Sequence, residues 1–575
     1  RPLAGSCVRG RTLAAAAAPR RPGQAAAAEE AAAPRWPFLR NKGLIAGLAD
    51  FIQPPGRGVS AQQLWVTGAR GNGAGTAVRA AIGQAGTSGQ LGSTVTLVFD
   101  CSKGSPGAGS SAPLRVDPSW LSNFEEAVQQ QLAEQLQPFK ATESLVHALV
   151  NAVVKRHSEA PAAFVSMVET AGSRAGLPRV LRVGTELAGW KDILARFRTQ
   201  PAQLVFQVAS NIVAMRQVDL RPATVLHVAL ALVRDAGARS PGGPLRPAEY
   251  LLASASGLAA ASQCNMVMVL LRAEALTHPR HSHPLGAELW KAVEQCVDDG
   301  SGAMRLLVQS YDAIAAIRAH EAGANVLTAE EWPEEMARAV LVPRFIGAEE
   351  AAGWQGVWAA IGGHAAHLRR VAELVAAERR QQELTLRQEE LKKKRTEALR
   401  QLRPGRSPDA EAHSQLAEQQ FEQDSVRADA RAPAGAVESL LRRLPEALGE
   451  EVGAFERQVE VFLGHPFLRD LHQLHASRPG RLAAELASRL HALCTQAPTA
   501  VPSQDFKELS DPVVLALLDA GLLVPSWGST EGPRVRFASS LSRWLLLTWV
   551  DAQSADLSWR HWLEYRWWLS RDQKK

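Results

Sequence analysis

The stretch LWVTGARGNGAGTAV, residues Leu64 to Val78, decides the fold expected for this chain. Its first four residues are apolar, aromatic or β-branched and predict a buried β-strand. Four glycines follow that strand: Gly68, Gly71, Gly73 and Gly75. Glycine adopts backbone conformations that other residues rarely reach, so this segment predicts a tight loop. From Thr76 onward the composition favours a helix. The stretch therefore predicts a strand, a glycine loop and a helix in direct succession.

This succession suits an anion, because the loop N–H groups and the first turn of the helix face one space. It resembles the P-loop of NTPases, whose pattern is G-x-x-x-x-G-K-[ST]. Gly68 and Gly73 match the two glycines, whereas Ala74 stands at the lysine position and Gly75 at the hydroxyl position. The resemblance implies ATP and Mg²⁺ as possible cofactors. The residues expected to contact the nucleotide are Gly68, Arg70, Gly71, Asn72, Gly73, Ala74, Gly75 and Thr76.

The two replaced positions predict altered chemistry. In a P-loop the lysine gives positive charge to the β- and γ-phosphates, and the hydroxyl holds Mg²⁺. Arg70 and Thr76 are close enough in sequence to substitute in part. The alternative is a glycine-rich turn that only joins a strand to a helix. Both interpretations stay open at the level of this loop.

Composition sets broad limits on the protein. A chain of 575 residues, 46% hydrophobic and 21% charged, is long enough for two to four domains and excludes wholesale disorder. Lysine and arginine exceed aspartate and glutamate by 64 − 58 = 6, a weak argument for anionic partners. The five cysteines show no C-x-x-C spacing, which argues against a zinc site or a disulfide framework. No apolar run is long enough to predict a membrane span.

Residues 1–39 read as a disordered or transit-like segment. They are rich in alanine and arginine, with acidic residues only at Glu29 and Glu30. Such a composition is typical of organellar targeting peptides, which predicts a mitochondrial or chloroplast location. A low-complexity N-terminus of a cytoplasmic protein is the alternative.

Residues 40–345 are predicted to form the core. Val95–Phe99 is wholly apolar and ends at Asp100, and apolar strands that alternate with helices predict a parallel sheet covered on both faces. Asp100 then lies at the carboxyl end of a strand, where ligands bind in such sheets, or it caps a loop. Residues 120–218 read as a helical insertion.

Two later apolar runs are assigned by their resemblance to P-loop ATPases, in which a Walker B strand ends in an acidic pair. Arg221–Leu232 is expected to be this strand, although no Asp-Glu pair stands at the end of the run. Asp235 is the candidate catalytic carboxylate, or else a surface acid at a helix end. Asn265–Leu271 is expected to be the following, sensor-1-like strand.

Residues 346–435 are predicted to form a helical lid and a charged helical arm. In Ala339–Val375, an expected apolar strand precedes helices that contain Gly362, Gly363 and His364. These three residues resemble the lid-opening segment of archaeal-type and STAND ATPases. The resemblance makes Arg369 a sensor-2-like arginine that reaches the nucleotide; a solvent-facing arginine is the alternative.

The rest of the chain, residues 436–575, reads as helical, with an element over 506–550 that resembles a winged helix. Protein partners are expected at the charged segment 376–431 and at the tryptophan-rich tail. RNA is a less favoured partner for that tail.

These features together resemble AAA+ and STAND-type P-loop NTPases. They predict an α/β fold: a parallel-sheet P-loop NTPase core with a helical insertion, a helical lid, a charged helical arm and a C-terminal winged-helix-like module. The implied function is a nucleotide-binding scaffold or assembly factor with weak or absent hydrolysis. The alternatives are an active ATPase that uses Arg70, Thr76 and Asp235, and a structural subunit of an organellar ribosome or respiratory assembly.

Overall fold

The computed structural model describes most of the predicted core and parts of the C-terminal half. The described residues are 42–53, 62–87, 94–102, 116–135, 143–157, 222–262, 264–277, 284–298, 304–342, 354–401, 448–474, 479–495, 501–502, 511–528 and 532–555, with a few single positions between 159 and 203. The transit-like segment 1–39, the arm beyond residue 401 and the tryptophan-rich tail beyond residue 555 lie outside these ranges.

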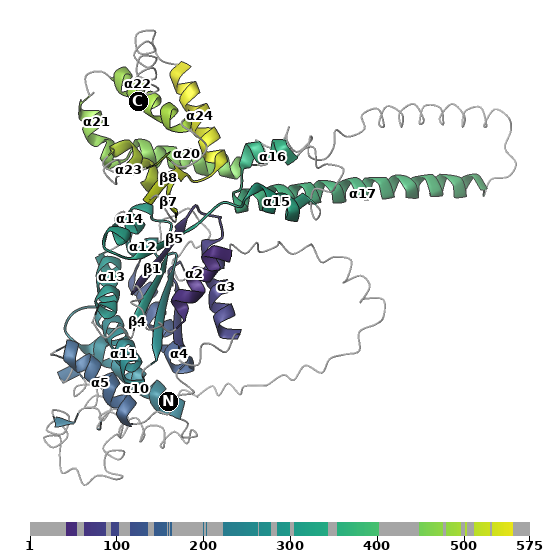
Figure 1. The fold of residues 1–575 in the computed structure, drawn as a ribbon. Helices are drawn as coiled ribbons and strands as arrows, with labels where there is room; N and C mark the ends of the chain where they lie inside the picture. Colours follow the sequence, from purple (N-terminus) through teal and green to yellow (C-terminus); the bar gives the residue numbers. More distant parts are fainter. Residues whose placement is uncertain are drawn as a thin grey trace, which may run out of the picture. The chain divides into compact units, whose positions relative to one another are not determined.

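Five parallel strands form the central sheet (Figure 1). They are β1 (Gln63–Gly68), β2 (Thr94–Asp100), β3 (Asn265–Leu271), β4 (Met304–Gln309) and β5 (Asn325–Ala329). Their spatial order is β2-β3-β4-β1-β5, so the strand that leads into the glycine loop lies inside the sheet, between β4 and β5. Parallel neighbours need crossover connections, which helices supply. The predicted α/β class is confirmed.

Alternate residues of each strand face two different cores, as the pleat of a strand requires. On β3, Met266, Met268 and Leu270 belong to one buried cluster. Val267, Val269 and Leu271 belong to the other. The first cluster includes side chains of α4 (Pro118–Gln135), α5 (Glu143–Arg156), α10 (Pro222–Arg239), α11 (Arg246–Ser262) and α13 (Pro284–Val297). The second includes α2 (Lys42–Ile52) and α3 (Ala74–Thr87). The sheet is therefore covered by helices on both faces.

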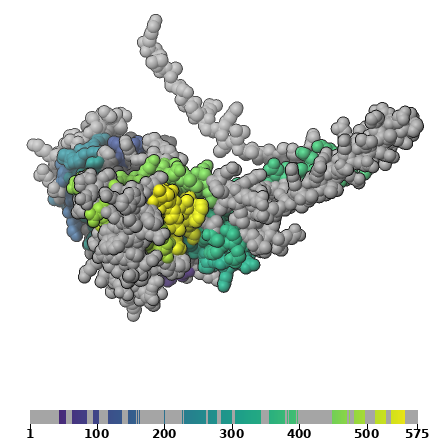
Figure 2. Space-filling model, turned by 90° about the horizontal axis from the view of Figure 1, so that it is seen from above, coloured from purple at the N-terminus to yellow at the C-terminus, as the bar shows by residue number. Residues whose placement is uncertain are grey.

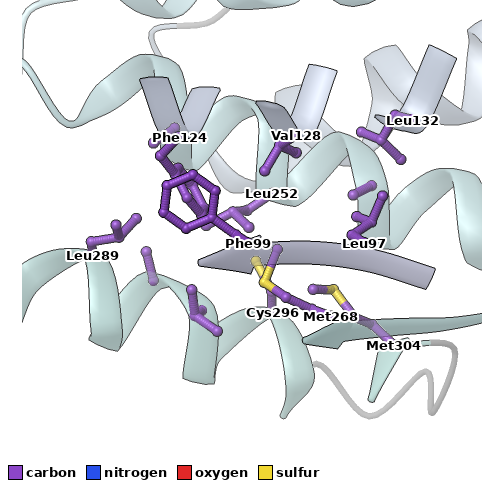
Figure 3. Packing of buried hydrophobic residues seen from close by; sticks show 14 of the residues in the cluster. Leu97, Phe99, Phe124, Val128, Leu132, Leu252, Met268, Leu289, Cys296 and Met304 are labelled. Atoms are coloured by element: carbon purple, nitrogen blue, oxygen red, sulfur yellow. The ribbon is translucent and has the colours of Figure 1, made fainter. Parts of the chain in front are cut away.

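Aromatic side chains fix α4 against strand β2 (Figure 3). The Phe99 ring meets Phe124 edge-on, with ring centroids 4.9 Å apart. It meets Trp120 in the same way at 5.2 Å. The Trp120 indole also donates a hydrogen bond to the Cys101 carbonyl at 2.8 Å. These contacts place α4 beside the free edge of β2.

Two glutamines of α4 bind the backbone of this edge strand. Gln131 accepts a hydrogen bond from the Val98 N–H at 2.6 Å and donates one to the Val98 carbonyl at 2.7 Å. Gln135 makes the same pair of bonds with Thr96. Strand β2 is the end of the sheet order, so these amides take the place of a neighbouring strand.

Two predicted strands are wrong. From residue 222 onward the predicted strand lies in helix α10, in which Leu226, Leu230 and Val233 recur at helical spacing and are all buried. Residues 339–342 are not a strand either, since they belong to the end of α15 (Glu334–Leu341) and its cap. The sheet obtains its remaining strands from β4 and β5, which were not predicted.

The C-terminal half contains two groups of helices. In the first, α16 (Trp354–Ile361) and α17 (Ala365–Gln401) lie on either side of residues Gly362, Gly363 and His364, which we call the glycine-histidine turn. Helix α17 is 37 residues long. A second group has its own buried core: α20 (Gly449–Leu463), η3 (Pro466–Leu468), α21 (Arg469–Leu474), α22 (Pro479–Thr495), α23 (Pro512–Asp519) and α24 (Ser540–Ala555).

This second group also contains a small antiparallel sheet in the order β6-β8-β7. Its strands are β6 (Val501–Pro502), β7 (Leu523–Gly528) and β8 (Gly532–Phe537). Helix, turn at Gly521, strand, strand and helix follow one another over residues 512–555. Figure 2 shows α24 in yellow, and α16 contacts this helix. Among the described helices, none has the length and apolarity needed to cross a membrane.

Candidate phosphate-binding site

The glycine loop lies at the carboxyl end of β1 and leads into α3. The other strands of the sheet run parallel to β1, so their carboxyl ends meet at the same edge. That edge is where open α/β sheets bind ligands. The residues that end the five strands are Gly68, Asp100, Leu271, Gln309 and Ala329.

Three loop glycines have positive φ angles: 145° at Gly68, 97° at Gly71 and 84° at Gly73. A side chain at Gly68 would place its Cβ 2.7 Å from the Ala329 carbonyl oxygen, so this glycine is required by close packing. A Cβ at Gly73 would meet no atom within 4 Å. The loop therefore packs tightly at its start and is open at its end, where α3 begins.

The residues at the lysine and hydroxyl positions supply no charge. Ala74 is fully buried in the core between α2 and α3. A Cβ at Gly75 would lie 3.6 Å from Gln309 Oε1, so the first turn of α3 faces the end of β4. Thr76 is exposed.

Two amide side chains at the loop, those of Asn72 and Gln309, are buried. Asn72 is 7% exposed; its Oδ1 accepts a hydrogen bond from the Ala365 N–H at 3.2 Å. Gln309 is 0% exposed; its Oε1 accepts one from the Arg272 N–H at 2.9 Å. Within the described part of the chain, Asn72 Nδ2 has no hydrogen-bond partner, whereas the Gln309 amide has the Tyr311 side chain as a partner. Unpaired buried donors are rare and costly, so the Asn72 donor is suited to an acceptor such as a phosphate oxygen.

Asp100 is held by two arginines. Arg272 Nε and Nη2 donate to its two carboxylate oxygens, each at 3.0 Å, and Arg79 of α3 donates at 2.9 Å. Burial alone would raise the pKa of Asp100, but hydrogen bonds from Ser102 and the charge of Arg272 hold that pKa below its ordinary value. This carboxylate is therefore ionised and already paired.

Glu274 is a second carboxylate at this edge. It follows β3 in the short helix α12 (Glu274–Thr277), and its Oε1 lies 3.7 Å from an Arg70 guanidinium nitrogen. Burial raises the pKa of Glu274 above its ordinary value, although Arg70 opposes this. The Arg70 side chain is 74% exposed and lies over the Tyr311 ring at 5.5 Å, so its hold on Glu274 is weak.

The glycine-histidine turn meets the glycine loop directly. His364 Nε2 lies 2.8 Å from the Arg70 carbonyl oxygen, and since a carbonyl only accepts, this nitrogen carries the proton. A side chain at Gly71 would place its Cβ 2.7 Å from Ala366 Cβ. The two stretches singled out in the sequence, about 290 residues apart, therefore form one structure.

Two neighbouring histidine rings, tilted by 33° to each other, lie at this contact. The rings of His364 and His367 are 4.0 Å apart between centroids. Burial, together with the neighbouring His367, lowers the pKa of His364 to about 3. Burial lowers the pKa of His367 to about 4. Both rings are therefore neutral near pH 7.

Two predicted site residues make contacts other than those expected. Arg369 is on the exposed side of α17, where it binds Glu373 at 2.8 Å. Asp235 lies on α10 beside Arg234, and α10 packs against α4, α5 and α11. In Figure 1, α10 lies at the opposite end of the sheet from α12 and α14 (Ala313–Glu321), which follow the carboxyl ends of β3 and β4. The prediction that Asp235 ends a strand is wrong, because its segment is helical.

Sequence reasoning missed Gln309 and the role of Arg272. Arg305 interrupts the apolar run of β4, and this hid the strand; the arginine is 2% exposed and donates to the Gln53 carbonyl and to Asn265. Arg272 directly follows strand β3, which the sequence predicts as an apolar strand. The sequence assigns that strand as sensor-1-like, and this assignment does not predict the contact of Arg272 with Asp100.

The residues at this edge fit phosphate oxygens but not Mg²⁺. Mg²⁺ needs oxygen ligands, usually one or two carboxylates. Leu271 and Arg272 end β3, Asp100 is bound by two arginines, and Glu274 faces Arg70. Across the ranges that the structure describes, no three or more His, Cys, Asp or Glu side chains are grouped to hold a metal ion.

Comparison of the chain with protein-family models, with curated proteins and with solved structures gives no match. The geometry of the site is therefore the basis on which its function is inferred.

Proposed function

We propose that this protein is a P-loop NTPase-related scaffold of the AAA+ or STAND type, which binds a nucleotide at the glycine loop and hydrolyses it weakly or not at all. The observation that carries the proposal is the buried, unpaired amide donor of Asn72 beside the loop, close to the buried amide of Gln309 that faces the first turn of α3. These amides supplement the backbone N–H groups at the start of α3, which are suited to donate to an anion.

Weak hydrolysis follows from the residue that stands at the lysine position of the loop and from the carboxylates at the strand ends. Phosphoryl transfer depends on cations and on a positioned nucleophile. Ala74 brings no cation to the phosphates, and Asp100 is bound by arginines rather than free to position water or metal. Glu274 is the remaining carboxylate of the edge, and burial favours its neutral form by raising its pKa.

A scaffold role is supported by the connections from the loop to the C-terminal half. His364 binds the Arg70 carbonyl, and a side chain at Gly362 would place its Cβ 2.3 Å from Ser540 Oγ at the start of α24. The Trp527 N–H of β7 also donates to Thr328 Oγ1 of β5 at 3.3 Å. A nucleotide at the loop would thus hold together the core, the lid and the winged-helix-like module. The segment 376–431 is proposed as the site for protein partners.

The test measures nucleotide binding in isosteric variants. Asn72→Asp and Gln309→Glu keep the oxygens that accept from Ala365 and Arg272 but replace each N–H₂ donor with a charged oxygen that repels phosphate. We expect titration calorimetry with ATP to show about a 10-fold or larger loss of affinity in each variant. This loss corresponds to about 1.4 kcal/mol or more of binding free energy. Asp235→Asn on α10, the reverse exchange of an acid for an amide far from the loop, is the control and should leave affinity unchanged.

Two results would contradict the proposal. One is a wild-type protein that binds no nucleotide. The other is equal affinity in Asn72→Asp, Gln309→Glu and the wild type. Rapid turnover of ATP by the wild-type protein would instead remove the claim of weak hydrolysis.

A further inference from the structure

We infer that the Arg272 guanidinium takes the place of a metal ion at this site, so that nucleotide phosphates bind without Mg²⁺ and in competition with the Asp100 carboxylate. The inference rests on the proposed function and adds to it the form of the ligand, a metal-free polyphosphate. It starts from the disagreement between the residues at the strand ends and the needs of Mg²⁺.

Arg272 is fixed at the edge of the loop by its backbone. Its N–H donates to Gln309 Oε1 at 2.9 Å, and that oxygen faces Gly75 at the start of α3. The following residue, Ala273, donates to the Gln309 carbonyl at 3.0 Å. The cation after β3 is therefore joined through one buried glutamine to the first turn of the phosphate-binding helix.

The backbone of Arg272 is strained. Its φ is 54°, and among the residues that the structure describes no other non-glycine residue has a positive φ. For a non-glycine residue that conformation is unfavourable. Strain of this kind persists where surrounding contacts enforce it, and it clusters at functional sites.

The ion cluster carries spare positive charge. Two guanidinium groups, of Arg272 and Arg79, share the single carboxylate of Asp100. The side chains of these arginines are 40% and 58% exposed, so a solute can reach both. Arg79 is four residues after Gly75 on α3, which places the two on the same side of that helix. The cluster therefore offers a net charge of about +1 beside the first turn of α3.

A phosphate can replace the Asp100 carboxylate at the Arg272 guanidinium. The Arg272 guanidinium binds the carboxylate through two parallel hydrogen bonds, the geometry with which arginine also binds phosphate. The Asp100 carboxylate thus occupies an anion position that a terminal phosphate would take. Removing its charge should free both arginines for the ligand.

The experiment measures the affinity for ATP and for inorganic pyrophosphate by titration calorimetry, at one ionic strength, with EDTA and with excess Mg²⁺. We expect wild-type affinities that agree within about twofold in the two conditions. Asp100→Asn should bind about 10-fold more tightly, since a neutral amide no longer competes for the arginines. Arg272→Gly should bind about 10-fold more weakly, and glycine suits the φ of 54°, so this variant keeps its fold.

The outcomes separate the inference from the proposed function. Binding that requires Mg²⁺, or Arg272→Gly with wild-type affinity, overturns the inference and leaves nucleotide binding intact. An Asp100→Asn variant that binds more weakly than the wild type, while both give the same circular dichroism spectrum, also overturns it. Absence of binding by every variant in both conditions overturns the proposed function together with the inference.

Discussion

Two glycines of the loop that look alike in sequence differ in what requires them. Gly68 and Gly73 both match the P-loop pattern and both have positive φ. Only Gly68 is pressed against another backbone, at 2.7 Å between its hypothetical Cβ and the Ala329 oxygen. Gly73 faces open space. The first glycine therefore serves the packing of the sheet, and the second leaves room for a ligand.

This difference predicts unequal losses of stability. Gly68→Ala should lower the free energy of unfolding by about 3 kcal/mol or more, from backbone strain plus displacement of β5. Gly73→Ala should cost about 1–2 kcal/mol, because only the strain remains. Urea unfolding followed by circular dichroism compares the two. Equal losses would show that both positions are packed alike.

At the residue scale the sequence predicted the loop well and its surroundings poorly. The strand, glycines and helix of residues 63–87 follow from local chemistry. Gln309 lies more than 230 residues after the loop, and its role arises from strand order, which no local pattern contains. The same holds for Arg272, whose contact with Asp100 joins the ends of two neighbouring strands.

At the scale of elements, α10 shows why one apolar segment was misread. Its sequence, PATVLHVALALVRDAGAR, contains a run of valine, leucine and alanine that suits a buried strand or a buried helix equally. The structure selects the helix, whose 18 residues bury one face against α4, α5 and α11. Strand β3 has only seven residues, all buried, and could be predicted from its length. Length separates the two cases better than composition does.

The long helix α17 changes character along its length. Near its start Leu368, Val371 and Val375 are buried, whereas farther along Leu384 and Leu391 are each 60% exposed. We expect Leu384→Glu and Leu391→Glu together to leave the thermal unfolding temperature unchanged, because little packing is lost. Leu368→Ala on the same helix should cost about 2–5 kcal/mol, since that side chain is 1% exposed.

Differential scanning calorimetry of the purified full chain checks this contrast. A large drop for the Leu384 and Leu391 variant would mean that these leucines are covered in solution. In that case the arm would contribute to the stability of the fold, and its proposed role in binding partners would lose support.

At the scale of the whole molecule, the buried histidine pair links stability to pH. The pKa values of His364 and His367, about 3 and about 4, lie below the value of about 6.5 in an unfolded chain. Below pH 6.5 the unfolded chain takes up protons that the folded rings do not. Their effect is therefore a loss of stability that begins near pH 6.5 and grows as the pH falls toward 4.

We expect His364→Gln with His367→Gln to reduce the loss of unfolding free energy between pH 7 and pH 5 by up to about 2 kcal/mol for each ring. Glutamine Nε2 is still able to donate to the Arg70 carbonyl, as His364 does. Urea unfolding at the two pH values measures the difference. The exposed His147→Gln on α5 is the control, and its loss should match that of the wild type. An undiminished loss in the double variant would show that this pair does not set the acid sensitivity.

The two glutamines of α4 have a consequence for how this protein can assemble. Gln131 and Gln135 occupy backbone groups of β2, one of the two outer strands of the sheet. An open outer strand is the template from which cross-β aggregates grow, and here part of that template is already used. The amide side chains of α4 therefore leave fewer free backbone groups on β2 for pairing with a strand of another chain.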